Sequence, residues 1–340
     1  MTDEYLKALE QKLTGDIDKD FMFLISEANH LRKLGLIEDA QQVLKLFESK
    51  FAEEGKKYLM NKAKASYEKR KADYMEMIEC EKNNDISKAT DILVRLIDTF
   101  PIKRQLQENQ VLKSFNCLFE NIHYENFYNP EKKKIVLLEE PYANYYFHLA
   151  FCMAQVEDYD KAMDSLNTCL SYDEVNPDAY FLKASCYYKT GNIDEFFKNI
   201  SKGMEVSYSK FHLGNAYFQL ARYFSSIGDK KTAQVCILMA KNYASTKDLE
   251  EVEKEVNKLP GENFKAQNIN DIKDTLDSKQ IQLGPNPKVL QTLTTALKKS
   301  KEKGNKKLIK YFLTILFELT HDQKVKKDLD DLNSEENNER

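Results

Sequence analysis

The sequence predicts an all-α protein, built as a right-handed α-solenoid of helix-turn-helix repeats with a C-terminal helical cap. Two observations lead to this prediction. Only 10 Gly and 7 Pro interrupt 340 residues rich in Lys, Glu, Leu and Ala, a composition that favours long helices. The chain also resembles itself at a spacing near 34 residues, a period typical of helical repeat arrays.

Three copies of one pattern lie between residues 140 and 245. Each opens with a tyrosine followed four residues later by an alanine, and a second helical segment follows at a constant offset. A large residue four positions before a small one lets one helix lean closely on the next. The openings are Tyr146/Ala150, Tyr180/Ala184 and Tyr217/Ala221, and the second segments carry Ala162/Leu166/Cys169, Phe196/Ile200/Gly203 and Ala233/Ile237/Ala240.

More degenerate units are expected before residue 140. Gly35 separates two apolar stripes, and a long charged helix over 56–82 is expected to end at Asn83-Asn84, because Asn tolerates left-handed backbone. Another helix then runs to Pro101, where it stops. Residues 103–128 are expected to form one more amphipathic helix, around Leu112, Phe115, Leu118 and Ile122.

The C-terminal third reads as a connector followed by a cap. A polar helix is expected over 246–258, then a loop with one short helix over 261–284, then a helical pair split near Gly304. The acidic, Asn-rich end is expected to be disordered. The predicted domains are 1–140 (degenerate repeats), 141–245 (three clear repeats), 246–284 (polar helix and connector), 285–327 (cap) and 328–340 (acidic tail).

The three central copies resemble the tetratricopeptide repeat family. In that family the first helix carries a large residue, a small one four later and an aromatic three after that; here these are Tyr146/Ala150/Met153, Tyr180/Ala184/Tyr187 and Tyr217/Ala221/Phe224. The family's turn glycine is matched by Gly191 and Gly228, but Glu157 replaces it in the first copy. Phe196 replaces the family's small residue on the second helix, which predicts looser packing there.

The resemblance implies a binding groove on the concave face, lined by the first helix of each pair. It assigns the tyrosines and alanines to helix packing and the phenylalanine after each tyrosine to the groove, an apolar surface with polar edges that suits a peptide or an amphipathic helix. The expected partner-binding residues are Asn144, Phe147, Phe151, Phe181, Tyr188, Asn215, Phe218 and Arg222, flanked by Gln155, Asp178 and Ser185. Alternatively, residues 103–140 or the segment after 261 cover these aromatics.

Motifs for chemistry are missing from the sequence. No phosphate-binding Gly-rich loop, nucleophile elbow or paired-Cys zinc spacing occurs, so we expect no enzyme, no cofactor and no metal. His148 and Cys152 stand at i,i+4 spacing, but no second pair accompanies them, which favours packing over metal binding. The family's carboxylate clamp for C-terminal peptides is not matched, because Phe147, Phe151 and Leu182 stand where it needs Lys or Asn.

The charge of the chain bears on which classes of partner it binds, and its cysteines bear on the compartment. The net charge of -4 does not favour nucleic acid or anionic membranes, and no apolar run is long enough to span a membrane. A lysine-rich stretch, Lys298–Lys310, reads either as a phosphate or acidic-partner patch or as a solvated helix end. Six scattered cysteines and no secretory signal favour the cytoplasm.

The predicted function is a non-enzymatic cytoplasmic adaptor that binds a partner peptide or helix in the concave groove. Two alternatives stay open. One is a structural subunit built permanently into a larger protein assembly, and the other is a regulator of a nucleic-acid complex that acts through the Lys298–Lys310 patch.

Overall fold

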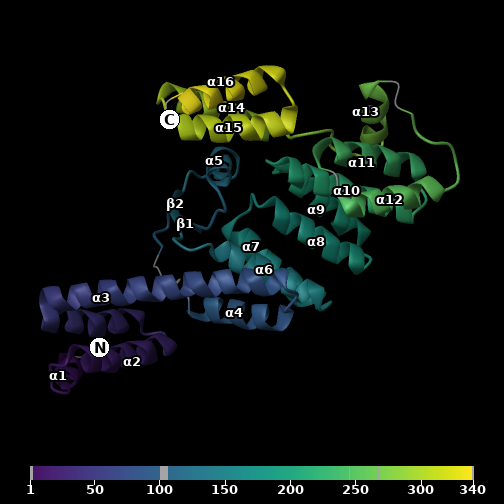
Figure 1. Cartoon of the computed structure of the whole chain (residues 1–340). Helices are drawn as coiled ribbons and strands as arrows, with labels where there is room; N and C mark the ends of the chain where they lie inside the picture. The colour runs from purple at the N-terminus through teal and green to yellow at the C-terminus, as the bar shows by residue number, and fades with distance from the viewer. Residues whose placement is uncertain (1–2, 100–105, 245, 266–267, 339–340) are drawn as a thin grey trace. The chain divides into compact units, whose positions relative to one another are not determined.

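A computed structural model describes residues 3–99, 106–244, 246–265 and 268–338 (Figure 1). The chain divides into two compact units, one up to Glu79 and one from Cys80 onward. The described residues are overwhelmingly helical, with a single pair of short strands in the second unit. The predicted all-α class is therefore confirmed.

The first unit is one helical pair with an extra N-terminal helix. Its core comes from the two apolar stripes either side of Gly35, with Leu24, Ala28, Ala40 and Phe47 buried. The last helix runs on past the unit's end and is interrupted at Ala52, whose φ of 44° is not helical. The helices are α1 (Asp3–Glu10), α2 (Ile17–Lys33) and α3 (Ile37–Lys82).

The second unit is built of antiparallel helix pairs that follow one another along the chain (Figure 1). Its repeat helices are α4 (Ile86–Thr99), α6 (Tyr142–Gln155), α7 (Tyr159–Tyr172), α8 (Pro177–Lys189), α9 (Ile193–Glu205), α10 (Lys210–Ser226) and α11 (Lys230–Tyr243). The remaining helices are α5 (Leu118–Phe127), α12 (Lys247–Lys258), α13 (Ile269–Asp277), α14 (Pro287–Glu302), α15 (Lys306–Thr320) and α16 (Gln323–Asn338).

Six helix pairs in the described chain share one turn. The first helix ends on a residue of left-handed backbone, and the next N–H bonds to the carbonyl five residues earlier, which satisfies carbonyls that the helix end leaves unpaired. The left-handed residues are Gly35, Asn84, Glu157, Gly191, Gly228 and Gly304, with φ between 59° and 79°. The bonds are Leu36→Leu31, Asp85→Cys80, Asp158→Met153, Asn192→Tyr187, Asp229→Phe224 and Asn305→Ser300, at 2.8–3.1 Å.

The same turns begin the second helix of each pair. In five of them the side chain after the left-handed residue accepts a hydrogen bond from the third residue of the new helix, as N-cap residues do. These caps are Asp85, Asp158, Asn192, Asp229 and Asn305. In five of the six turns, a left-handed residue followed by Asp or Asn is thus the local signal that folds the second helix back on the first; in the other turn Leu36 follows Gly35.

The segment before the central repeats departs from the prediction. In place of a helix over 103–128, residues Gln110–Lys113 form strand β1, which pairs in parallel with β2 (Lys134–Leu137), and α5 is the crossover between them. Residues 103–105 lie outside the described chain. The helical reading of 110–113 is wrong because Lys113 is held by tertiary contacts: its ammonium donates to the Ser171 carbonyl at 3.0 Å and pairs with Glu174.

The C-terminal end also differs from the prediction. The tail from residue 328 is not disordered as far as Asn338, because it continues α16, while 339–340 lie outside the described chain. Leu332 is buried, and Lys301 of α14 forms an ion pair with Asp328 at 2.7 Å. The helical pair split at Gly304 is α14 and α15, and the short helix of the connector is α13.

The core of the second unit is spread along the array instead of forming one centre. One cluster lies within α6–α8 around Ala150 and Leu166, and another extends from α8 to α15 around Tyr217 and Leu293. Each pair buries its apolar stripe against its neighbour, as in other repeat arrays.

The shared turn gives a first prediction. A Cβ on Gly191 would meet no atom within 4 Å, so Gly191→Ala tests the left-handed backbone alone. We expect it to lower the free energy of unfolding by about 1 kcal/mol. Glu157→Gly at the equivalent position should raise it by roughly 0.5 kcal/mol, because relief of strain exceeds the added chain entropy. Urea denaturation measures both, and no loss for Gly191→Ala would contradict this account of the turn.

Candidate functional site

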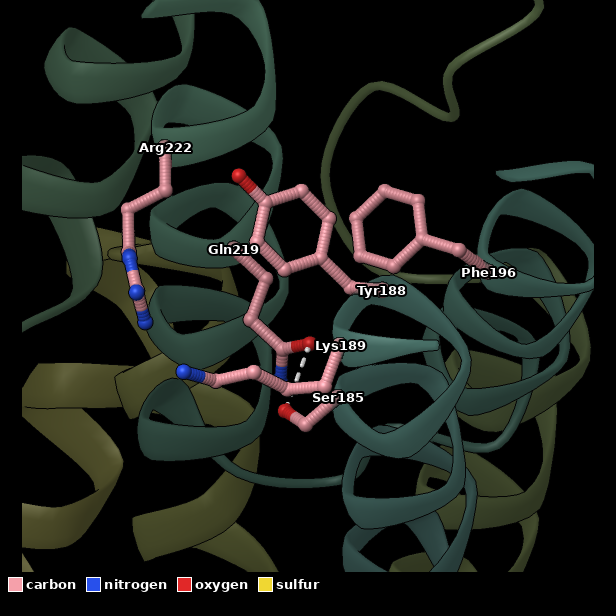
Figure 2. Close-up of a pocket in the computed structure, with 6 residues that line it drawn as sticks. All are labelled: Ser185, Tyr188, Lys189, Phe196, Gln219 and Arg222. Atoms are coloured by element: carbon pink, nitrogen blue, oxygen red, sulfur yellow. Dashed lines mark hydrogen bonds between the residues drawn. The ribbon is translucent and has the colours of Figure 1, made fainter. Parts of the chain in front are cut away.

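A shallow hollow lies between α8 and α10, the first helices of two successive pairs (Figure 2). Its volume is about 40 Å³, far below the roughly 300–1,000 Å³ of small-molecule sites. A hollow of this size suits a side chain presented by another protein better than an enclosed ligand. Its lining residues are Ser185, Tyr188, Lys189, Phe196, Gln219 and Arg222.

Two aromatic rings form the apolar wall of the hollow. The ring of Tyr188 lies 5.6 Å from that of Phe196, and Phe196 in turn lies 5.6 Å from Tyr223 of the next pair. Phe196 is fully buried at the position where the other two copies have alanine. The departure from the family pattern therefore supplies part of the site.

A hydrogen-bonded amide joins α8 to α10 across the floor of the hollow. Ser185 Oγ donates to Gln219 Oε1 at 3.2 Å, while Gln219 Nε2 donates to the carbonyl of Phe181 at 3.4 Å and to Asn215 Oδ1 at 3.3 Å. These bonds fix the orientation of Gln219 and bring the exposed Asn215 to the edge of the site.

Positive charge borders the hollow. Lys189 and Arg222 are both exposed, and Figure 2 shows their cationic ends on the same side of Gln219. The Arg222 guanidinium lies 5.7 Å from the centre of the Phe218 ring, within cation–π range. A carboxylate beside an apolar group would match this arrangement of two cations and an aromatic wall.

The structure brings together part of the predicted site. Tyr188 and Arg222 line the hollow, Phe218 lies half-buried beside Arg222, and Asn215 adjoins through Gln219. Three other predicted residues lie on α6, outside this lining, where each is half-buried: Asn144, Phe147 and Phe151.

Phe181 departs from its predicted role, because only 1% of it is exposed. A Cβ built on Gly203 of α9 would lie 2.5 Å from its ring, so the ring occupies the space that the glycine leaves free. The corresponding residues in the other copies are Cys169 and Ala240. The tyrosine and phenylalanine have exchanged roles here: Tyr180 is the half-buried one, whereas in the third copy Tyr217 is fully buried.

Lys189, Gln219 and Phe196 were not among the predicted binding residues. Lys189 follows Ser185 by four positions, so helical spacing could have placed it on the same face. Phe196 carried a visible signal, since a large ring stands where the family has a small residue. Nothing local marks Gln219, because its role depends on a neighbouring helix.

Among the described residues, none of either segment that could cover the groove lines this hollow. Residues 106–140 pack instead along the loops between repeats, where the ring of Phe119 lies 4.8 Å from that of Tyr208. The connector packs at Tyr217, whose hydroxyl donates to the Gln282 carbonyl at 2.7 Å and accepts from the Gly284 N–H at 2.9 Å.

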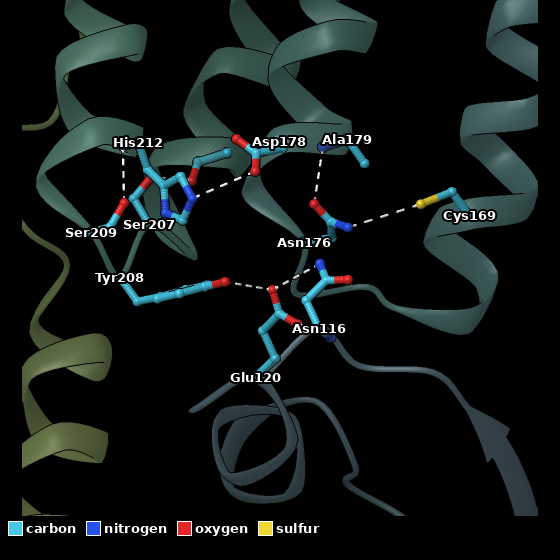
Figure 3. Close-up of polar contacts among 11 residues, drawn as sticks. Asn116, Glu120, Cys169, Asn176, Asp178, Ala179, Ser207, Tyr208, Ser209 and His212 are labelled. Carbon is cyan, nitrogen blue, oxygen red and sulfur yellow. Dashed lines mark hydrogen bonds and ion pairs between the residues drawn. The ribbon is translucent and has the colours of Figure 1, made fainter. Parts of the chain in front are cut away.

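A buried polar junction attaches α5 to those loops (Figure 3). Glu120 of α5 accepts hydrogen bonds from the Tyr208 hydroxyl at 2.8 Å and from the Asn116 N–H at 2.5 Å. Asp173, like Glu120, has no exposed surface, and its Oδ1 accepts from the Val175 N–H at 3.3 Å. Because both carboxyls are enclosed, their role is to hold the segment in place and not to reach a substrate.

These two carboxyls share a buried environment that favours a proton. Burial, and then the charge of Glu120, raises the pKa of Asp173 well above its usual range; burial also raises the pKa of Glu120. Within the described residues Oδ2 of Asp173 has no hydrogen-bond partner, so no donor stabilises the charged form of the carboxyl at this oxygen.

His148 and Cys152, the pair whose spacing resembles that of metal ligands, both contact the carboxylate of Glu81. Nδ1 of His148 lies 2.9 Å from a carboxylate oxygen of Glu81, and the Cys152 thiol donates to the same carboxylate at 3.7 Å. Burial raises the pKa of Cys152 to about 11, so it stays a thiol. No group of three His, Cys, Asp or Glu in the described residues could hold a metal ion.

The lysine-rich stretch is divided among several environments. Lys299 and Lys303 border a cavity of about 390 Å³ between α5 and the α14–α15 pair, whereas Lys301 is paired with Asp328. It therefore does not form one uniform cationic face. In the described residues no helix is long and apolar enough to cross a membrane.

Comparison with known proteins identifies one repeat. Residues 143–176 match the family model described as tetratricopeptide repeat, a stretch that coincides with α6, α7 and the loop that follows. No curated protein matches the chain. The second unit is thus a helical-repeat array that contains a tetratricopeptide repeat. Repeats of this family generally serve in protein interaction or scaffolding, and proteins that carry them are generally non-enzymatic adaptors.

The burial of Phe181 gives a second prediction. Phe181→Ala should lower the free energy of unfolding by about 3–5 kcal/mol, because it leaves a cavity beside Gly203. Phe218→Ala is the matched control and should cost less than half as much, since Phe218 is only half-buried. If both variants unfold with the same free energy as the unmodified protein, Phe181 is not buried in the core.

The carboxyl pair gives a third prediction. The raised pKa of Asp173 means that the folded state binds more protons than the unfolded one, so this residue's contribution to stability falls as pH rises from about 4. Asp173→Asn removes that titration. We expect the variant to lose less stability than the unmodified protein between acidic and alkaline pH, as measured by urea denaturation at several pH values. Identical pH profiles would contradict the raised pKa of Asp173.

Proposed function

We propose that the protein is a cytoplasmic, non-enzymatic adaptor that holds an acidic peptide segment of a partner protein at the α8–α10 hollow. The observation that carries the proposal is the meeting of two exposed cations, Lys189 and Arg222, with an aromatic wall in one hollow. Side chains of this kind, on the first helices of successive repeats, are suited to a peptide that lies across them.

The contacts suggest how the segment is held. A partner carboxylate accepts hydrogen bonds from the Arg222 guanidinium and the Lys189 ammonium, which are stronger than bonds between neutral groups. An adjacent apolar side chain enters the hollow against Tyr188. The exposed amide of Asn215 donates to the peptide backbone at the edge.

The location in the cytoplasm rests on the thiols. All six cysteines are free, and five of them are buried, an arrangement suited to a compartment that keeps thiols reduced. The absence of catalysis rests on the general use of these repeats.

Peptide display on the full-length protein tests the proposal. Enriched sequences should place Asp or Glu beside an apolar residue. The affinity of one enriched peptide, measured by fluorescence anisotropy, should fall about tenfold or more in the Lys189→Glu/Arg222→Glu variant, because attraction becomes repulsion.

Lys254→Glu is the matched control, since Lys254 is an exposed lysine of α12 outside the hollow. It should leave the affinity unchanged, and all variants should keep the unmodified melting temperature. Enriched peptides without acidic residues, or an equal loss with Lys254→Glu, would rule out the proposed mode of binding.

A further inference from the structure

The two-stranded sheet has an open edge at β2. The strands pair in parallel from Gln110↔Lys134 to Lys113↔Leu137, and the ladder is bounded by bonds from Lys134 N to Asn109 O and from Leu138 N to Lys113 O. Since successive residues of a strand present their backbone groups to opposite sides, those of Ile135 and Leu137 point away from β1.

At the start of this edge the outward backbone groups are hydrogen-bonded to a side chain, whereas those in its middle are not. The Asn129 side chain accepts from the Lys133 N–H at 3.0 Å and donates to the Lys133 carbonyl at 2.9 Å. The next outward groups along the strand, on Ile135 and Leu137, have no such side-chain cap in the described residues. Leu137 is also 47% exposed, a large apolar side chain on the same edge.

The charges that flank β2 are opposite at its two ends. Lys132, Lys133 and Lys134 precede its apolar residues, and Glu139 and Glu140 follow them. Within the chain Lys133 forms an ion pair with Glu131 at 2.8 Å, in which both side chains are partly exposed, so Lys133 must be shared with or released to an acidic group of a second copy. Edge strands commonly carry charges that repel another copy. Here the pattern is self-complementary, because a second identical strand running antiparallel brings its acidic end beside the first strand's lysines.

Backbone and charge select the same register. If Val136 of each copy faces Val136 of the other, Ile135 lies opposite Leu137 and Lys133 lies opposite Glu139. Both outward residues of one strand then exchange N–H···O=C bonds with those of the other, giving four bonds about a two-fold axis. The exposed Leu137 packs against Ile135 of the second copy.

We infer that β2 is a self-association edge, at which two copies of this chain join their sheets antiparallel through Ile135 and Leu137, with Lys133 of each paired to Glu139 of the other. The edge is short, so the association is weak and depends on concentration, as expected of a small interface. It uses no residue of the α8–α10 hollow.

Sedimentation velocity on the full chain, from about 1 to about 200 µM, tests the inference in the range where small interfaces associate. The unmodified protein should shift from monomer to dimer. Lys133→Glu and Glu139→Lys should each weaken association about tenfold or more, because each places like charges opposite one another.

The decisive sample is an equimolar mixture of Lys133→Glu and Glu139→Lys. Opposite charges then face each other at both ends, so the mixture should recover the association that each variant loses alone. Leu137→Pro, which removes an outward N–H without touching the β1 ladder, should also prevent association. A monomer at every concentration, or a mixture no more associated than its components, would overturn the inference.

Discussion

The left-handed turn that closes each helix pair is the constraint on which the architecture depends. A helix of L-residues cannot reverse direction without leaving carbonyls unpaired, and the bond from the residue after the turn to the carbonyl five positions back satisfies one of them. Its recurrence at Gly35, Asn84, Glu157, Gly191, Gly228 and Gly304 gives successive pairs the same exit geometry. Neighbouring pairs can therefore stack and share their apolar stripes.

Departures from regular packing create the candidate site. Gly203 leaves space on α9 for the ring of Phe181, which draws that ring into the core. Phe196, too large for the position of the usual alanine, reaches the hollow beside Tyr188 and contacts the next pair through Tyr223. The same two substitutions in one copy thus remove one predicted contact residue and supply another.

Segments outside the repeats are attached by specific long-range contacts. The crossover helix α5 packs on the loops between repeats through Glu120 and Tyr208, and its His123 bonds to Thr292 of the C-terminal pair at 2.8 Å. Burial raises the pKa of both Glu120 and Asp173, which disfavours two charged carboxylates in this enclosed junction. The outcome is a second unit in which residues far apart in sequence form one apolar cluster.

The sequence by itself determined the helix pairs, because hydrophobic period, turn residue and N-cap are all local signals. The resemblance to the repeat family predicted Tyr188 and Arg222 as binding residues, and both line the α8–α10 hollow. Only the tertiary structure decided the strand at Gln110–Lys113, the helical tail beyond residue 328 and the burial of Phe181. Each of these depends on a partner distant in the chain: Glu174 for Lys113, α14 for the tail and Gly203 for Phe181. Local periodicity carries no information about such partners.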